Sequence, residues 1–226
     1  MANETLSNKV NLLFEKDQWL KARKLLEEER ENDPTDHWVL TQLGVTFYET
    51  KQYEEALKMF TASFQIVKDC PLTLWNAAGA LSSLGRHKEA IPIYVWLLKA
   101  KTSVNKDPCW ESKKWSDALK TDCVYRLGLC FEYLDKRETA EHCYIQYLTL
   151  VATGVKGTYS IDDVLSRVHR LGGEAGPEEK TRDLQNAIKS TLMAVEPNST
   201  KDRASGDLLR LDSSDLVPEL LVASKR

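Results

Sequence analysis

The sequence of 226 residues lacks a long apolar run and an excess of charge of either sign. No stretch has the length and apolar character of a signal peptide or a membrane span. Lysine and arginine total 31 against 34 aspartate and glutamate residues, a formal net charge of -3. Because nucleic-acid binding needs a basic surface, we expect a cytoplasmic protein that binds neither nucleic acid nor a membrane.

Recognisable catalytic and metal-binding motifs are also missing from the sequence. It contains no phosphate loop, no nucleophile elbow and no HExxH motif, and its four histidines are dispersed. The cysteines have no CxxC spacing, so we predict small buried apolar side chains rather than a metal site. They are Cys70, Cys109, Cys123, Cys130 and Cys143. We therefore expect a protein that is not an enzyme and that has no cofactor and no metal.

A period of 34 residues is the main positive signal. Alanine recurs at Ala22, Ala56 and Ala90, and large residues recur at fixed offsets from it. These are Trp19, Tyr53 and His87 three residues before the alanines, and Leu26, Phe60 and Tyr94 four residues after them. A fourth copy fits around Ala140 after 16 inserted residues. Such a period is typical of stacked helical hairpins, in which each hairpin buries its apolar face against its neighbours.

The recurring small residues have a packing reason. Two antiparallel helices approach closely only where a side chain is small, which explains the alanines and also Gly44 and Gly128. Large residues one turn away then fill the space between neighbouring hairpins. The pattern therefore predicts the helix pairs 4–15 with 18–31, 37–50 with 53–68, and 72–84 with 87–101.

This pattern resembles the tetratricopeptide repeat family. The residues that carry the resemblance are Leu43, Gly44, Phe47, Tyr53, Ala56 and Phe60, with Leu84, Gly85, Ala90 and Tyr94 in the next copy. It covers about residues 3 to 154. The resemblance implies an all-α, right-handed α-solenoid of about four helical hairpins, closed by a C-terminal capping helix and followed by a partly flexible tail.

The domain organisation follows from the repeats. We predict an array over residues 3–172, with an insertion at about 102–117 that extends the first helix of the fourth hairpin; a separate short helix is the alternative. Asp107 and Pro108 fit the start of that long helix. Ser160 and Asp163 open the capping helix, which ends at Gly172. Residues 173–226 form a C-terminal extension with an amphipathic helix at 178–195 and an acidic-hydrophobic tail.

The resemblance also implies a binding surface, because the first helix of each hairpin in that family lines a concave groove. The matching positions predict an aromatic groove that holds an apolar peptide or helix of a partner protein. They are Asn11, Phe14, Trp38, Thr41, Val45, Tyr48, Leu72, Trp75, Gly79, Tyr125, Leu129 and Tyr133. Gly79 beside Trp75 would leave a hollow for an inserted apolar side chain. The alternative is that several of these residues are packed between hairpins.

The sequence favours an adaptor or chaperone among several hypotheses. The two-carboxylate clamp of chaperone-binding relatives does not fit, because the matching positions supply no lysine and Asp122 would repel a carboxylate. An apolar groove is more similar to type III secretion chaperones of translocator proteins. A structural or regulatory subunit that docks or dimerises through the insertion or the extension is the alternative, as is an accessory of an enzyme. Residues 208–222 form a further hypothesis, a self-contact with the groove.

Overall fold

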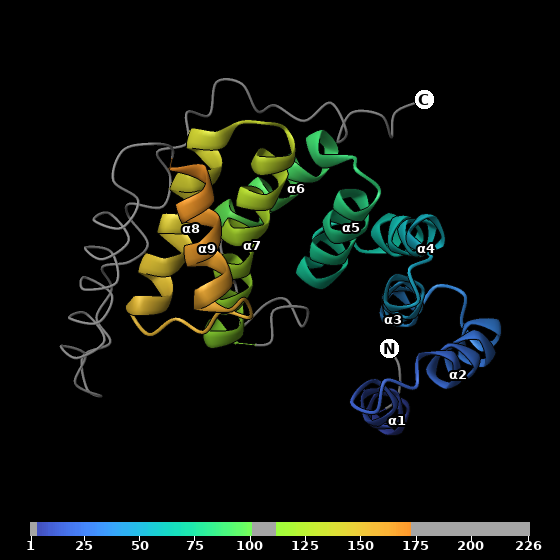
Figure 1. Ribbon diagram of the computed structural model, residues 1–226. Coiled ribbons are helices and arrows are strands. Elements are labelled where there is room, and N and C mark those ends of the chain that lie inside the picture. Colours follow the sequence, from blue (N-terminus) through green and yellow to red (C-terminus); the bar gives the residue numbers. More distant parts are fainter. Residues whose placement is uncertain (1–3, 101–111, 173–226) are drawn as a thin grey trace. The chain divides into compact units, whose positions relative to one another are not determined.

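The computed structural model describes residues 4–100 and 112–172, and this part of the chain is built from helices (Figure 1). They are α1 (Glu4–Phe14), α2 (Trp19–Asn32), α3 (His37–Glu49), α4 (Tyr53–Ile66), α5 (Pro71–Ser83), α6 (His87–Lys99), α7 (Lys113–Tyr133), α8 (Arg137–Ala152) and α9 (Ile161–Leu171). The helical hairpins predicted from the period are confirmed. The predictions for the helix at 178–195 and for the tail lie outside the described residues, as does most of the insertion.

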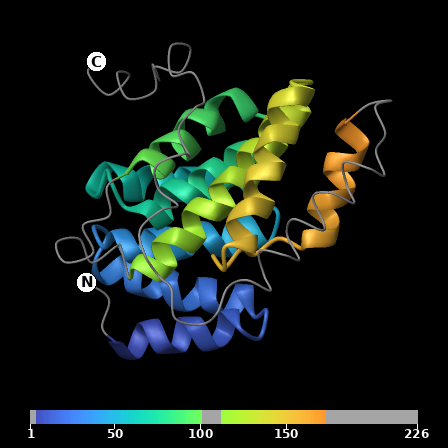
Figure 2. The same ribbon diagram turned by 90° about the vertical axis from the view of Figure 1, so that its left-hand side faces the viewer.

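The chain divides into two compact units, with the boundary inside α6 between Ile93 and Tyr94. In unit 1, α2 packs on α1 and α3, and α5 packs on both α3 and α4. In unit 2, α7 and α8 form a helix pair and α9 packs on α8 (Figure 2). Each unit is thus a stack of consecutive helices, as expected when every hairpin is covered by the next.

The repeated small residues lie where the helices of a hairpin meet. Ala22, Ala56, Ala90 and Ala140 are completely buried. A methyl group added to Gly44 would overlap the ring of Phe60, and one added to Gly128 would lie 2.7 Å from the ring of Tyr144. The spacing of these residues therefore encodes the close approach of each helix pair, which confirms the packing argument made from the sequence.

The turns of the four hairpins are built alike. Asp17, Lys51, Gly85 and Asp135 each have a positive φ of 53° to 75°. They occupy the same position of the repeat once the 16 inserted residues are counted. After each one, the next residue donates its backbone N–H to a carbonyl five residues earlier, as Gln52 does to Phe47 at 2.9 Å. This is the Schellman ending of a helix, which needs one left-handed residue.

The first helix of the fourth hairpin begins later than the sequence predicted. Ser112 is the N-cap of α7, and its hydroxyl accepts the backbone N–H of Trp115 at 3.1 Å. Helix α7 therefore starts at Lys113, whereas its start was predicted at Asp107 and Pro108, which lie outside the described residues. With 21 residues α7 is still the longest helix described. Lys120 on its added part donates to the carbonyl of Ala100 at 2.7 Å and holds the end of α6.

Helix α9 begins and ends as predicted. Its apolar residues Val164, Leu165 and Val168 are buried, while Asp162, Ser166, His169 and Arg170 are exposed. This polar outer face is what a terminal helix of an array needs. One detail was wrong: the Ser160 side chain makes no capping hydrogen bond. The Asp163 carboxylate instead accepts a hydrogen bond from α7, described below.

The described cysteines are interior residues. Cys70, Cys123, Cys130 and Cys143 are buried and form no disulfide bond with one another, and burial raises the pKa of the Cys143 thiol to about 12. This agrees with the prediction of small buried side chains. Over residues 4–100 and 112–172 no group of three or more histidine, cysteine or acidic residues is arranged to hold a metal ion. None of the helices in these ranges has the length and apolar character to cross a membrane.

Candidate functional site

Thr41 of α3 is an interior residue of unit 1. Only 1% of it is exposed, and its Oγ1 lies 2.8 Å from Oγ of Ser63 in α4 and 2.7 Å from Oγ1 of Thr73 in α5. Thr41 and Ser63 also donate to the carbonyl oxygen of His37. The three hydroxyl groups thus fasten α3, α4 and α5 together. We therefore leave Thr41 out of the candidate surface.

Tyr125 of α7 holds the same repeat position as Thr41, 15 residues before the repeated alanine, and it is also buried. Its ring stacks on Tyr159 with centroids 3.7 Å apart, and its hydroxyl donates to Oδ2 of Asp163 at 2.8 Å. Burial and the carboxylate raise the pKa of Tyr125 to about 12. In unit 1 this position is covered by α5, and in unit 2 it is covered by the segment that leads into α9. The sequence had left this possibility open as packing between hairpins.

The segment from Gly157 to Tyr159 is held firmly against α7 and α8. Both oxygens of the Asp122 carboxylate accept hydrogen bonds from Thr158, from its backbone N–H at 2.9 Å and from its hydroxyl. The Tyr147 hydroxyl donates to the carbonyl of Tyr159 and accepts its N–H. A side chain at Gly157 would overlap that hydroxyl, so only glycine fits. This network makes the segment a structural part of unit 2.

Glu132 is the charged centre of the same unit. Its carboxylate accepts hydrogen bonds from the Tyr144 hydroxyl at 2.6 Å, from Arg167 at 3.0 Å and from Arg170. Burial alone would raise the pKa of Glu132, but these donors outweigh it and leave the pKa below its ordinary value.

Of the other residues predicted on α7, Leu129 is half-buried and Tyr133 is 72% exposed.

The predicted hollow at Gly79 is filled by the chain itself. The ring of Tyr48 in α3 lies over Gly79 of α5, with its nearest atom 3.7 Å from where a methyl group on Gly79 would be. Its hydroxyl accepts a hydrogen bond from Ser83 at 3.3 Å. Gly79 is itself buried and Tyr48 is half-buried. The Tyr48 ring therefore covers Gly79, although a methyl group at Gly79 would also fit beneath the ring.

The remaining predicted residues of unit 1 lie at the edge of its core. Phe14 and Trp38 are half-buried and pack against a cluster of buried residues that includes Val10, Val39 and Leu43. Val45 is half-buried beside Ala56, Phe60 and Ala80, which form a second cluster. Leu72 and Trp75 are half-buried and Asn11 is exposed. These side chains combine an apolar part with some access to solvent, which a docking surface needs.

Helical spacing places Trp38 and Val45 on one stripe of α3, Leu72 on one stripe of α5 and Asn11 on one stripe of α1. On α3 the stripe is Trp38, Gln42, Val45 and Glu49, and on α5 it is Leu72, Asn76, Gly79 and Ser83. On α1 the stripe holds Asn8 and Asn11, and Glu15 follows directly after the end of the helix. Residues three or four apart share one side of a helix. We call these three stripes, together with the half-buried Phe14, Tyr48 and Trp75 on the same helices, the first-helix face of unit 1.

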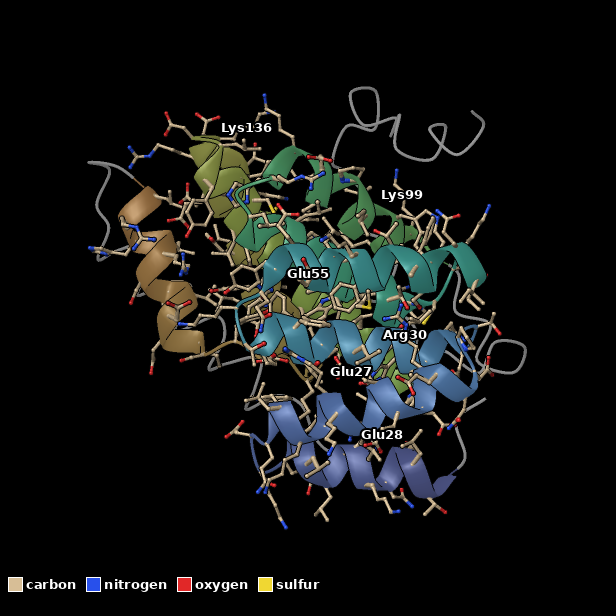
Figure 3. The ribbon with its side chains drawn as sticks, turned by 90° about the vertical axis from the view of Figure 1, so that its right-hand side faces the viewer. Glu27, Glu28, Arg30, Glu55, Lys99 and Lys136 are labelled. Atoms are coloured by element: carbon tan, nitrogen blue, oxygen red, sulfur yellow. The ribbon has the colours of Figure 1, made fainter. Side chains whose placement is uncertain are left out.

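The second helices carry a different kind of surface. Glu27, Glu28 and Arg30 of α2 are exposed, and Glu55 of α4 pairs with Lys58 at 2.7 Å (Figure 3). An exposed pair of this kind adds little to stability and keeps the surface hydrated. The contrast between the charged second helices and the mixed apolar and amide first helices marks the first-helix face as the candidate site.

Solved structures similar to this chain share the same architecture. MamA from Desulfovibrio magneticus RS-1 is 13% identical over 87% of this chain and 97% of that chain, with a TM-score of 0.60. YrrB, described as a TPR protein with an unusual peptide-binding site, is 13% identical over 85% and 88%, with a TM-score of 0.55. TPR-like repeats of a putative kinesin light chain from Podosopora anserina are 14% identical over 83% and 92%, with a TM-score of 0.58.

No family model matches the sequence, and no curated protein matches it. The structural likeness, together with the register of the repeats, defines the class. The chain has the fold of tetratricopeptide repeat proteins, a solenoid of helical hairpins. At identities of 13% to 14% the likeness concerns the fold alone.

Proposed function

We propose that the protein is a non-enzymatic cytoplasmic adaptor or chaperone that holds an apolar segment of a partner protein on the first-helix face of unit 1. The observation that carries the proposal is the row of half-buried apolar side chains on consecutive first helices, Trp38, Val45 and Leu72. Half-buried aromatic and branched residues are held in place by the core below them, so they bind a partner at little entropic cost. The peptide-binding site named for YrrB supports the same use of the fold.

The proposed surface is smaller than the groove predicted from the sequence. Thr41, Gln42, Gly79 and Tyr125 are buried and are excluded from it. Phe14, Trp38, Val45, Tyr48, Leu72 and Trp75 remain, with Asn11 at one edge. Leu129 and Tyr133 belong to unit 2, so they are not part of the surface proposed for unit 1.

The test is a selection of random 12-residue peptides displayed on phage against the full chain. A selected peptide is then synthesised, and its affinity is measured by fluorescence anisotropy. Val45→Glu places a charge in the middle of the face and is expected to weaken binding at least tenfold. Leu20→Glu is the matched control, since Leu20 is 68% exposed on α2, outside the face. Equal binding by both variants would refute the proposed surface.

A further inference from the structure

The connection between α8 and α9 lies on the surface of unit 2. It runs from Thr153 to Ser160 and is longer than every other helix connection that lies wholly within the described ranges (Figure 1). None of the residues in this connection is buried. We call its residues 157–159, with the sequence Gly-Thr-Tyr, the strap. The strap is therefore held by its contacts with α7 and α8 rather than by burial in the core.

The main chain of the strap is bonded to side chains, as the main chain of a bound peptide would be. Asp122 accepts the backbone N–H of Thr158 at 2.9 Å and also accepts its hydroxyl. The Tyr147 hydroxyl donates to the carbonyl of Tyr159 at 2.7 Å and accepts the N–H of the same residue at 2.9 Å. A hydroxyl group can donate and accept at once, so one side chain pairs both main-chain groups of Tyr159.

Other contacts select the side chains of the strap. The ring of Tyr159 stacks on that of Tyr125, with centroids 3.7 Å apart and an angle of 15° between the planes. The hydroxyl of Tyr159 accepts a hydrogen bond from Nε of Arg126. A methyl group on Gly157 would overlap the Tyr147 hydroxyl, so only glycine fits there. The site therefore fits glycine, then threonine or serine, then tyrosine.

Helix α9 is held to unit 2 by contacts other than those of the strap. Its residues Val164, Leu165 and Val168 are buried, and α9 packs on α8. Arg167 of α9 also pairs with Glu132 at 3.0 Å. A hydrogen bond at the surface adds less to stability than the burial of such an apolar side chain. Because local opening needs few buried apolar contacts to be lost, the strap opens more easily than the helices on either side of it.

We propose that unit 2 carries a second binding site, for a partner segment with the sequence glycine, threonine or serine, and tyrosine, and that the strap fills this site until such a segment displaces it. The site is independent of the first-helix face of unit 1. The strap is tethered beside its site, so its local concentration is on the order of millimolar. A free peptide therefore binds the parent protein weakly, because it competes with the strap.

The experiment uses the full chain and a fluorescein-labelled peptide with the sequence of residues 155–161. Thr158→Ala combined with Tyr159→Ala removes the side-chain contacts of the strap and leaves the site unchanged; we call this the open variant. We expect the open variant to bind the peptide at least tenfold more tightly than the parent protein, because its own strap no longer competes. Fluorescence anisotropy measures the affinity, and circular dichroism verifies that the variant is folded.

Matched variants and peptides locate the site. Lys156→Ala combined with Ser160→Ala removes two exposed side chains beside the strap, and the Ser160 hydroxyl makes no capping hydrogen bond. This variant should bind the peptide as weakly as the parent protein does. Adding Asp122→Asn to the open variant should abolish its gain in affinity, because an amide accepts through one oxygen only and carries no charge. A peptide with Thr158→Val should also bind weakly to the open variant.

Hydrogen exchange of the parent protein tests the release of the strap without any substitution. The N–H groups of Thr158 and Tyr159 should exchange faster than those in the middle of α7 and α8, because the strap opens while the helices stay folded. Exchange as slow as in these helices would overturn the proposal, even if the open variant did not fold.

Two binding results would also overturn the proposal. The first is equal affinity of the open variant and the parent protein for the peptide. The second is a dimeric parent protein whose open variant is monomeric, which would assign the site to the strap of a second copy of this chain. Neither result would affect the first-helix face of unit 1, because Val45→Glu tests that surface with other peptides.

Discussion

The hydroxyl group of Tyr125 in α7 donates a hydrogen bond to Oδ2 of Asp163 in α9, 2.8 Å away. The bond joins the last helical pair to the terminal helix, and the ring of Tyr159 covers the same tyrosine. Tyr125→Phe keeps the ring and removes the bond, so we expect it to lower the free energy of unfolding by about 1 kcal/mol. Urea unfolding followed by circular dichroism measures this change.

Tyr133→Phe is the matched control for that experiment, because Tyr133 lies on the same helix and is 72% exposed. Its free energy of unfolding should stay within about 0.5 kcal/mol of the parent protein. If both variants lost the same stability, the hydrogen bond to Asp163 would have no special role.

Acid should weaken unit 2 through its paired carboxylates. Burial alone would raise the pKa of Glu132 and that of Asp163. Hydrogen bonds from Tyr144, Arg170 and Arg167 outweigh this effect at Glu132. Hydrogen bonds from Tyr125 and Arg167 outweigh it at Asp163. Both pKa values therefore lie below the ordinary 4.5 and 3.8. A depressed carboxyl pKa gives stability that is present above the unfolded value and is lost as pH falls through the folded value. We therefore expect stability to fall as the pH drops below about 4.5.

Glu132→Gln tests this origin of the acid sensitivity. The variant is less stable than the parent at pH 7, because it loses its charged partners Arg167 and Arg170. The difference between the two proteins should shrink as the pH approaches 3, where the parent carboxyl is also neutral. Asp122 acts in the opposite direction, since burial raises its pKa. A difference that stays constant from pH 7 to pH 3 would contradict the assignment.

Gly44 is required by the ring of Phe60. Gly44→Ala places a methyl group where the ring already lies, so we expect a loss of about 1 to 3 kcal/mol in unfolding free energy. Adding Phe60→Leu removes the ring and should recover part of that loss in a double-mutant cycle. Additive effects of the two substitutions would show that the ring does not set the spacing of α3 and α4.

Lys51 carries a strained backbone in the second hairpin. Its φ is 60°, a left-handed value that costs a residue with a side chain roughly 1 kcal/mol relative to glycine. Lys51→Gly should therefore stabilise the protein. Gly85 occupies the equivalent turn with a φ of 75°, so Gly85→Ala is expected to destabilise it by a similar amount. Thermal unfolding of the two variants checks the opposite signs.

Much of the fold was predictable because it is encoded at short range. Each alanine, its aromatic neighbours and the glycine of the first helix lie within about 20 residues of one another. The start of α7 was predicted at Asp107 with Pro108, whereas the N-cap of this helix is Ser112. Nothing in the local sequence indicated the hydrogen bond from Lys120 to the carbonyl of Ala100.

The sequence by itself determined the helical hairpins, their register and the set of positions on the first helices. Only the tertiary structure decided which of those positions remain accessible to a partner and which are buried. Thr41 is covered by Thr73, and Tyr125 by Tyr159, which are 32 and 34 residues further along the chain. The burial of a position depends on which distant segment packs against it, and a local sequence pattern does not contain this information.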